Sequence, residues 1–315
     1  MFRLPFAPSP KAKTHELADF VEWTCWRDGT YSARAANTAL NQIDDNFENE
    51  GCDDDSDINE QNLDEVFIEL ERRNKACAGG YPFQLNKLGS FLRHIDIDDA
   101  EPRYIVYRYL LMGTRLNMSI NATHAGLRGD VLMEHLGAHI MKNYLGSKRS
   151  QSMVFGTAEE GGFAAKVDDL CSALGEGGGF KNQDEGTIYP NDGKLDVVTW
   201  TPFADGKPSK LIVFTQCKTG TSWYDEVTKT RPDAFFYNWT KNRTICHDAI
   251  RAFAVSESAY PKRWGDFSKQ GGIFLDRCRL VDYAEDLKEE MVNQLKTWTD
   301  AAFSSVKEIL PYQRR

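Results

Sequence analysis

The segment Leu211–Lys218, LIVFTQCK, begins with four apolar residues and a threonine and ends with Gln216 and Lys218 two positions apart. Side chains alternate along a β-strand, so Gln216 and Lys218 are expected on one face and Cys217 on the other. A buried polar group without a partner is costly, and an unpaired buried charge costs far more. These two side chains must therefore pair inside the protein, lie at an open sheet edge, or bind a ligand.

A second strand pattern precedes this segment. KLDVVTW, residues 194–200, is rich in β-branched and aromatic residues, and Asp205-Gly206 with Pro208 supplies turn chemistry between the two segments. Asp196, Val198 and Trp200 share one face of this strand. A hairpin between the two segments therefore predicts that Asp196 lies beside Gln216 and Lys218.

The rest of the chain alternates between helical and strand patterns. Helices are expected at residues 15–26, 33–47, 63–75, 82–94, 102–116, 127–146, 161–175 and 284–309. Further strands are expected at residues 153–156, 250–256 and 271–281. This order predicts an α/β protein, with a helical accessory domain at residues 1–120 and a mixed-sheet domain at residues 121–315.

Length and composition point to a globular, intracellular protein. The chain has 315 residues, of which 41% are hydrophobic, and contains no apolar run of about 18 residues that would span a membrane. Its seven scattered cysteines include no C-x-x-C pair, which indicates reduced thiols. We therefore expect a cytoplasmic protein without a membrane partner.

Charge is distributed unevenly along the chain. The formal net charge is −9, which excludes a protein that coats nucleic acid by overall basicity. Residues 1–100 hold 20 acidic and 10 basic side chains, whereas residues 207–270 hold 11 basic and 6 acidic ones. The later region is suited to an anionic ligand, although a solvated surface explains the same excess. Candidate contacts to phosphates and bases are Lys229, Arg231, Lys241, Arg243, Trp223, Tyr224, Phe235 and Trp239.

Two other motifs are weaker. Asp53, Asp55 and Asp57 mimic the first ligands of a calcium loop, but Ile58 and Asp64 stand where such a loop needs Gly and Glu, so an acidic loop before a helix is expected. His135 and His139 are spaced to share one helix face, but no third metal ligand is evident.

Asp196 followed by Gln216-x-Lys218 at the end of an apolar strand resembles the PD-(D/E)xK, or restriction-endonuclease-like, nuclease superfamily. The similarity is to its Mrr-like branch, in which Gln replaces an acidic residue, and DGKLD, with Asp192 and Asp196, is similar to a turn of that branch. The phrases GKLDVVTWTPFADGKP and TQCKTGTSW also look like those of bacterial defence-associated nuclease-fold proteins. The resemblance covers roughly residues 125–255, and it implies a mixed sheet flanked by helices.

The resemblance also implies roles for individual residues. Asp196, the side-chain oxygen of Gln216 and the backbone carbonyl of Cys217 would hold Mg²⁺ or Mn²⁺, and Lys218 would position the water or the phosphate. An acidic residue on a preceding helix completes the pattern, with Glu134 preferred and Glu160 the alternative. Hard oxygen ligands of this kind suit Mg²⁺. A nucleophilic role for the Cys217 thiol is disfavoured because strand alternation points it away from Lys218.

We therefore expect a metal-dependent DNA endonuclease of a bacterial anti-phage defence or restriction system. The acidic amino-terminal region is expected to contact partner proteins rather than DNA. The alternative is a catalytically weak or inactive nuclease-fold subunit that binds DNA or scaffolds a complex, because Gln216 carries no charge for the metal.

Overall fold

The computed structural model describes residues 2–9, 11–32, 56–86, 90–95, 101–156, 162–184, 195–306, 308 and 310. The helices are α1 (Thr14–Asp28), α3 (Ser56–Ala76), α4 (Pro102–Arg115), α5 (Gly129–Tyr144), α6 (Phe163–Leu174), α7 (Pro232–Trp239), α8 (Trp264–Gly271), α9 (Arg277–Asp282) and α10 (Glu289–Ser305). The strands are β1 (Thr30–Ser32), β2 (Phe83–Leu85), β3 (Phe91–His94), β4 (Thr123–His124), β5 (Leu127–Arg128), β6 (Gln151–Val154), β7 (Val197–Thr201), β8 (Leu211–Lys218), β9 (Ile250–Val255) and β10 (Ile273–Leu275).

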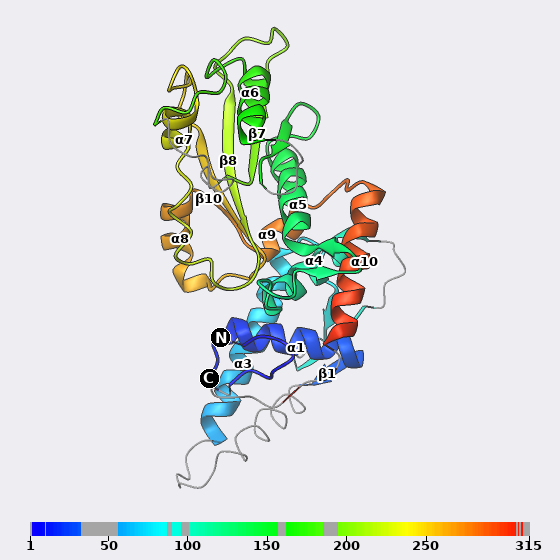
Figure 1. The fold of residues 1–315 in the computed structure, drawn as a ribbon. Helices are drawn as coiled ribbons and strands as arrows, with labels where there is room; N and C mark the ends of the chain where they lie inside the picture. Colours follow the sequence, from blue (N-terminus) through cyan, green and yellow to red (C-terminus); the bar gives the residue numbers. More distant parts are fainter. Residues whose placement is uncertain are drawn as a thin grey trace.

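A five-stranded mixed sheet with the order β10-β9-β8-β7-β6 organises the upper half of the molecule in Figure 1. β6, β7 and β8 are antiparallel neighbours, whereas β8, β9 and β10 run parallel. Val197 pairs with Thr215 and Trp200 with Ile212, so the hairpin predicted from the sequence is confirmed. The chain is an α/β protein, as expected.

The two faces of the sheet are covered by different helices. Val213 and Cys217 point into the core shared with α5, whereas Phe214 packs with residues of α6 and α7. Phe253, the register partner of Gln216, packs on the second face with α8. Because both faces of β8 are covered, its run from Ile212 to Cys217 is buried, as is usual for a central strand between helical layers.

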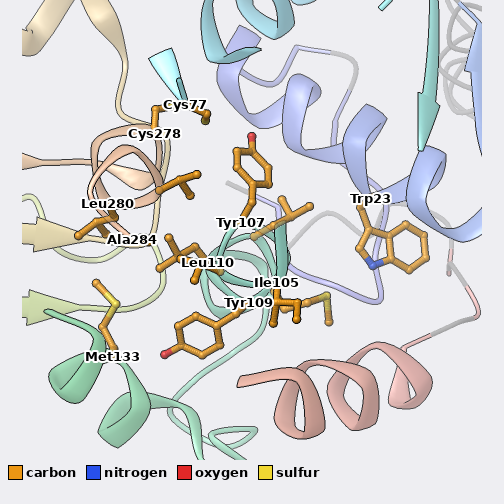
Figure 2. Close-up of a cluster of buried hydrophobic side chains, with 14 of the residues drawn as sticks. Trp23, Cys77, Ile105, Tyr107, Tyr109, Leu110, Met133, Cys278, Leu280 and Ala284 are labelled. Atoms are coloured by element: carbon orange, nitrogen blue, oxygen red, sulfur yellow. The ribbon is translucent and has the colours of Figure 1, made fainter. Parts of the chain in front are cut away.

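The lower half of the molecule is built on α1, α3 and α4, with a small antiparallel sheet of order β1-β3-β2, and α10 lies beside α4 (Figure 1). Figure 2 shows Trp23 of α1, Leu110 of α4, Met133 of α5 and Leu280 of α9 in one apolar cluster. This cluster crosses residue 120, so the two predicted domains are packed against each other. The division at residue 120 stays a prediction.

Three predicted elements are wrong or misplaced. Residues 82–94 hold the antiparallel strands β2 and β3 rather than a helix, because the Asn86 side chain accepts hydrogen bonds from the backbone N–H groups of Ser90 and Phe91 and closes a turn. The strand expected at 271–281 ends at Leu275, because the next residue, Asp276, caps α9 by accepting from the N–H of Arg279. The last helix begins at Glu289 rather than at residue 284.

Several predictions lie outside the described residues: the helix at 33–47, Asp53 and Asp55 of the acidic loop, and the residues Glu160 and Asp192. Asp57, which was expected in that loop, instead lies in α3, because this helix begins at Ser56. Within the part that is described, no helix has the length and apolar character that crossing a bilayer requires.

A buried ionic network joins the two halves of the molecule. Asp19 of α1 is fully buried, and its carboxylate lies 2.6 Å from both Arg73 Nη1 and Arg115 Nε and 2.8 Å from Arg277 Nη1. Burial alone would raise the pKa of Asp19, but the three guanidinium groups lower it well below its ordinary value. Because Arg277 also donates to the carbonyl of Ser256 directly after β9, this network fixes α1 against the end of the sheet.

Candidate functional site

The candidate site forms where β7 begins and β8 continues beyond it. Asp196 directly precedes β7, and its backbone N–H donates to the carbonyl of Thr215 at 3.3 Å. Among the described residues, none pairs with β8 as a strand on the β7 side beyond this point, and the Asp196 carboxylate accepts from the Cys217 N–H there at 2.7 Å. The carboxylate therefore lies against the β8 backbone between Gln216 and Lys218.

The carbonyl of Cys217 is directed toward the same place. Within one strand residue the N–H and C=O groups point to the same neighbouring strand, so the Cys217 carbonyl points toward the open end of β7. The next residue points the other way, since the Lys218 carbonyl accepts from Ser256 N–H beyond β9 at 3.0 Å. A carboxylate oxygen and a backbone carbonyl thus meet at one gap in the sheet.

Glu134 reaches this gap from α5. The helix approaches β8 closely, because an added Cβ at Gly137 would lie 2.6 Å from Cys217 Sγ. The Glu134 carboxylate rests on Gly156, where an added Cβ would lie 2.5 Å from both carboxylate oxygens. The N–H of Gly156 donates to the backbone carbonyl of Asp196 at 3.2 Å, so Glu134 and Asp196 lie on either side of one glycine.

Gln216 and Lys218 occupy the opposite face of β8. Gln216 is only 1% exposed, and its Oε1 accepts from the Thr230 hydroxyl at 2.9 Å. Lys218 is 33% exposed, and its Nζ lies 3.9 Å from Glu226 Oε2. The amide therefore pairs inside the protein, whereas the ammonium remains accessible at the end of the strand.

The pKa of the Cys217 thiol responds to the charges of Asp196, Glu134 and Lys218. Burial raises the pKa of the Cys217 thiol well above its ordinary value, the negative charges of Asp196 and Glu134 raise it further, and Lys218 opposes them. The thiol is therefore neutral at pH 7, which argues against a thiolate nucleophile. Both carboxylates and the ammonium lie within electrostatic reach of one residue.

The donor atoms at this gap match a hard cation. Mg²⁺ prefers oxygen ligands and usually takes only one or two carboxylates from a protein, and Asp196, Glu134 and the Cys217 carbonyl offer oxygens of this kind. Within the described part of the chain, no group of three or more His, Cys, Asp and Glu side chains is arranged to hold a metal. His139 is engaged elsewhere, since its Nε2 lies 2.7 Å from the carbonyl of Glu285.

The basic and aromatic residues after β8 divide into core and surface. Trp223 and Phe235 are buried at 1% and 3% exposure, so the expectation that they stack on bases is wrong for these two. Tyr237 is 55% exposed instead, and the Arg243 guanidinium lies 5.1 Å from the centre of its ring. Tyr237 was not among the candidates for base stacking, although it follows Phe235 and Phe236 in α7, which both face the core.

Tyr237 and Arg243 line a cavity of about 910 Å³. Its lining includes Arg231, Arg243 and Arg251, together with Thr228, two residues before the Thr230 that binds Gln216. Asp233 and Asp248 also line the cavity, and Asp233 pairs with Arg231 at 2.9 Å. Guanidinium groups beside an exposed tyrosine can contact a phosphate backbone and stack on a base.

No family model, curated protein or solved structure matches this chain.

Proposed function

We propose that the protein is a metal-dependent DNA endonuclease with a restriction-endonuclease-like core. The observation that carries this proposal is the Asp196 carboxylate bound to the Cys217 N–H at 2.7 Å, with the Glu134 carboxylate packed against Gly156, whose N–H donates to the Asp196 backbone carbonyl. The mixed sheet with helices on both faces supports the same proposal.

The proposed roles follow from position. Asp196, Glu134 and the Cys217 carbonyl would hold Mg²⁺ or Mn²⁺, with Gln216 as a further oxygen ligand, because its amide oxygen keeps a second lone pair beside the bond to Thr230. The bound cation would polarise a phosphate oxygen and stabilise the charge that develops as the phosphodiester is hydrolysed. Lys218, the accessible cation of the group, would orient the water or the phosphate.

DNA would approach along the surface of Arg243 and Tyr237, which contains the positive charge and the exposed ring that such binding uses. The resemblance in sequence supports a role in a bacterial defence or restriction system, and the scattered cysteines support a location in the cytoplasm. Partner proteins would bind the acidic amino-terminal half.

A second candidate function is a nuclease-fold subunit that does not cut. It is favoured by the buried bond between Gln216 and Thr230, which engages the one side chain that replaces an acidic metal ligand. Such a subunit would bind DNA through the same surface or scaffold a complex.

The test is the nicking of supercoiled plasmid with Mg²⁺ or Mn²⁺, compared with the same reaction in EDTA. Lys218→Ala should reduce the rate strongly, whereas Lys207→Ala, which removes an exposed lysine from the turn of the same hairpin, should not. Absence of metal-dependent nicking with intact DNA binding would favour the second candidate.

A further inference from the structure

A second cavity, of about 550 Å³, opens at the edge of the sheet between α5, β6 and α6. β6 is the last strand of the five-stranded sheet on this side, so the cavity lies at the edge of the sheet. Its volume lies within the range of roughly 300–1,000 Å³ that is typical of ligand pockets. It is separate from the arginine-lined cavity at α7, with which it shares no lining residue.

Its lining is strongly basic. The titratable residues around it are His135, His139, Lys142, Lys166, Lys288 and Asp169, which makes three ammonium groups and two imidazoles against one carboxylate. Among the residues that the structure describes, no carboxylate lies within ion-pair distance of Lys142 or Lys288.

The helix dipole accounts for the position of only one of the three lysines. Lys142 lies in the last turn of α5, where a cation is favourable, but Lys166 and Lys288 are not at helix carboxyl ends. Glu289 and Glu290 follow Lys288 but line a different hollow on α10. Positive charge is therefore gathered in the cavity itself.

The cavity shares a wall with the candidate site. Lys166 Nζ donates to the carbonyl of Gly156 at 3.0 Å. Gly156 is the residue on which the Glu134 carboxylate rests and whose N–H binds Asp196. His135, which lines the cavity, directly follows Glu134. A ligand bound by Lys166 would therefore lie near Gly156, against which the Glu134 carboxylate packs.

We propose that this cavity is a phosphate-binding subsite, with Lys142 and Lys288 as its principal contacts. Two lysines with no carboxylate within ion-pair distance among the described residues match a ligand that carries more than one negative charge, such as a terminal phosphate or two consecutive phosphates. The assignment to a strand phosphate next to the cleaved bond rests on the proposed function. The same chemistry would also bind the phosphates of a free nucleotide, and the experiment separates these two sources.

The first arm measures DNA binding without divalent metal, by fluorescence anisotropy over a range of salt concentrations. Lys142→Ala/Lys288→Ala should weaken binding and flatten the slope of log affinity against log salt by up to about 1.8 for duplex or 1.4 for single-stranded DNA. The control double variant, Lys75→Ala/Lys207→Ala, removes two exposed lysines outside the cavity and should leave the slope unchanged.

The second arm measures ATP binding by isothermal titration calorimetry. ATP binding that is lost in the cavity variant, with an unchanged DNA slope, upholds the phosphate subsite and assigns it to a free nucleotide. An unchanged DNA slope with no ATP binding to the wild type overturns the proposal. Neither arm measures cleavage, so a protein that binds phosphate here but never nicks plasmid would contradict the proposed function and leave the subsite standing.

Discussion

Replacing Gly156 with alanine tests whether Glu134 belongs to the reactive centre. The added methyl group would lie 2.5 Å from the carboxylate carbon and from both oxygens of Glu134, where ordinary contact begins at 3.4 Å. The carboxylate must therefore move by about 0.9 Å, because the methyl group is fixed to the backbone beside Asp196. Gly156 does not have a positive φ, so alanine itself adds no backbone strain there.

The expected effect is a large loss of rate without a large loss of structure. Displacing a catalytic group by about 1 Å can cost roughly 100-fold in rate. We therefore expect Gly156→Ala to slow Mg²⁺-dependent plasmid nicking by about two orders of magnitude. DNA binding in EDTA should change little, because the arginine-lined surface at α7 is untouched.

Gly162→Ala is the matched control. This glycine precedes α6 with an ordinary φ of −73°, and an added Cβ there would meet nothing within 4 Å. A double-mutant cycle with Glu134→Gln sharpens the test, because two changes that act through one carboxylate should not add. If Gly156→Ala folds and nicks DNA at the wild-type rate, Glu134 has no part in the chemistry. The role would then pass to Glu160, which Glu160→Gln would test.

Two further predictions concern stability and DNA binding. Asp19→Asn removes the carboxylate that faces three buried guanidinium groups, and it should lower the free energy of unfolding by about 3–5 kcal/mol. At the usual unfolding entropy for 315 residues, this corresponds to a fall of about 5–8 °C in melting temperature, measured by calorimetry. The control Asp28→Asn, at the exposed end of α1, should change the melting temperature little. Because the folded-state pKa of Asp19 is depressed, its contribution is complete above the ordinary carboxyl pKa and is lost only as the pH falls below it, so the difference between Asp19→Asn and wild type should be constant from pH 6 to 8. Arg243→Ala should weaken metal-free DNA binding for all sequences and lower the slope of log affinity against log salt by about 0.9. Tyr237→Leu should reduce the free energy of binding to single-stranded DNA by roughly 1–3 kcal/mol. If both variants bind DNA with the affinity of the wild type, this surface does not bind DNA.

Local patterns predicted the centre of the fold well. The alternation in LIVFTQCK and the Asp205-Gly206 turn determine the β7–β8 hairpin, and the apolar period around Leu136 determines α5. The failures arose where a side chain ends or redirects an element. Asn86 closes a turn inside a segment that has a helical period, and Asp276 ends a strand by capping a helix.

The candidate site was predictable in composition but not in detail. Strand pairing predicted Asp196 beside Gln216 and Lys218, and its carboxylate accepts from the N–H of Cys217 between them. No local pattern indicates that Thr230 would engage the Gln216 amide or that the Glu134 carboxylate would pack against Gly156. The network around Asp19 was hidden for the same reason, since its bond to Arg277 joins residues 258 positions apart. Contacts of this kind depend on tertiary packing, which a single sequence does not display.

The most direct test of the central claim compares cleavage and binding in Asp196→Asn. Asparagine keeps an oxygen that can accept from the Cys217 N–H, so the end of β8 should be preserved while one metal-binding charge is lost. Plasmid nicking with Mg²⁺ should be abolished, and DNA affinity measured in EDTA should be equal or slightly higher because a repulsive carboxylate is gone. Wild-type nicking by Asp196→Asn would contradict the metal mechanism, and a wild-type protein with no salt-dependent binding to any DNA would contradict the nucleic-acid function as well.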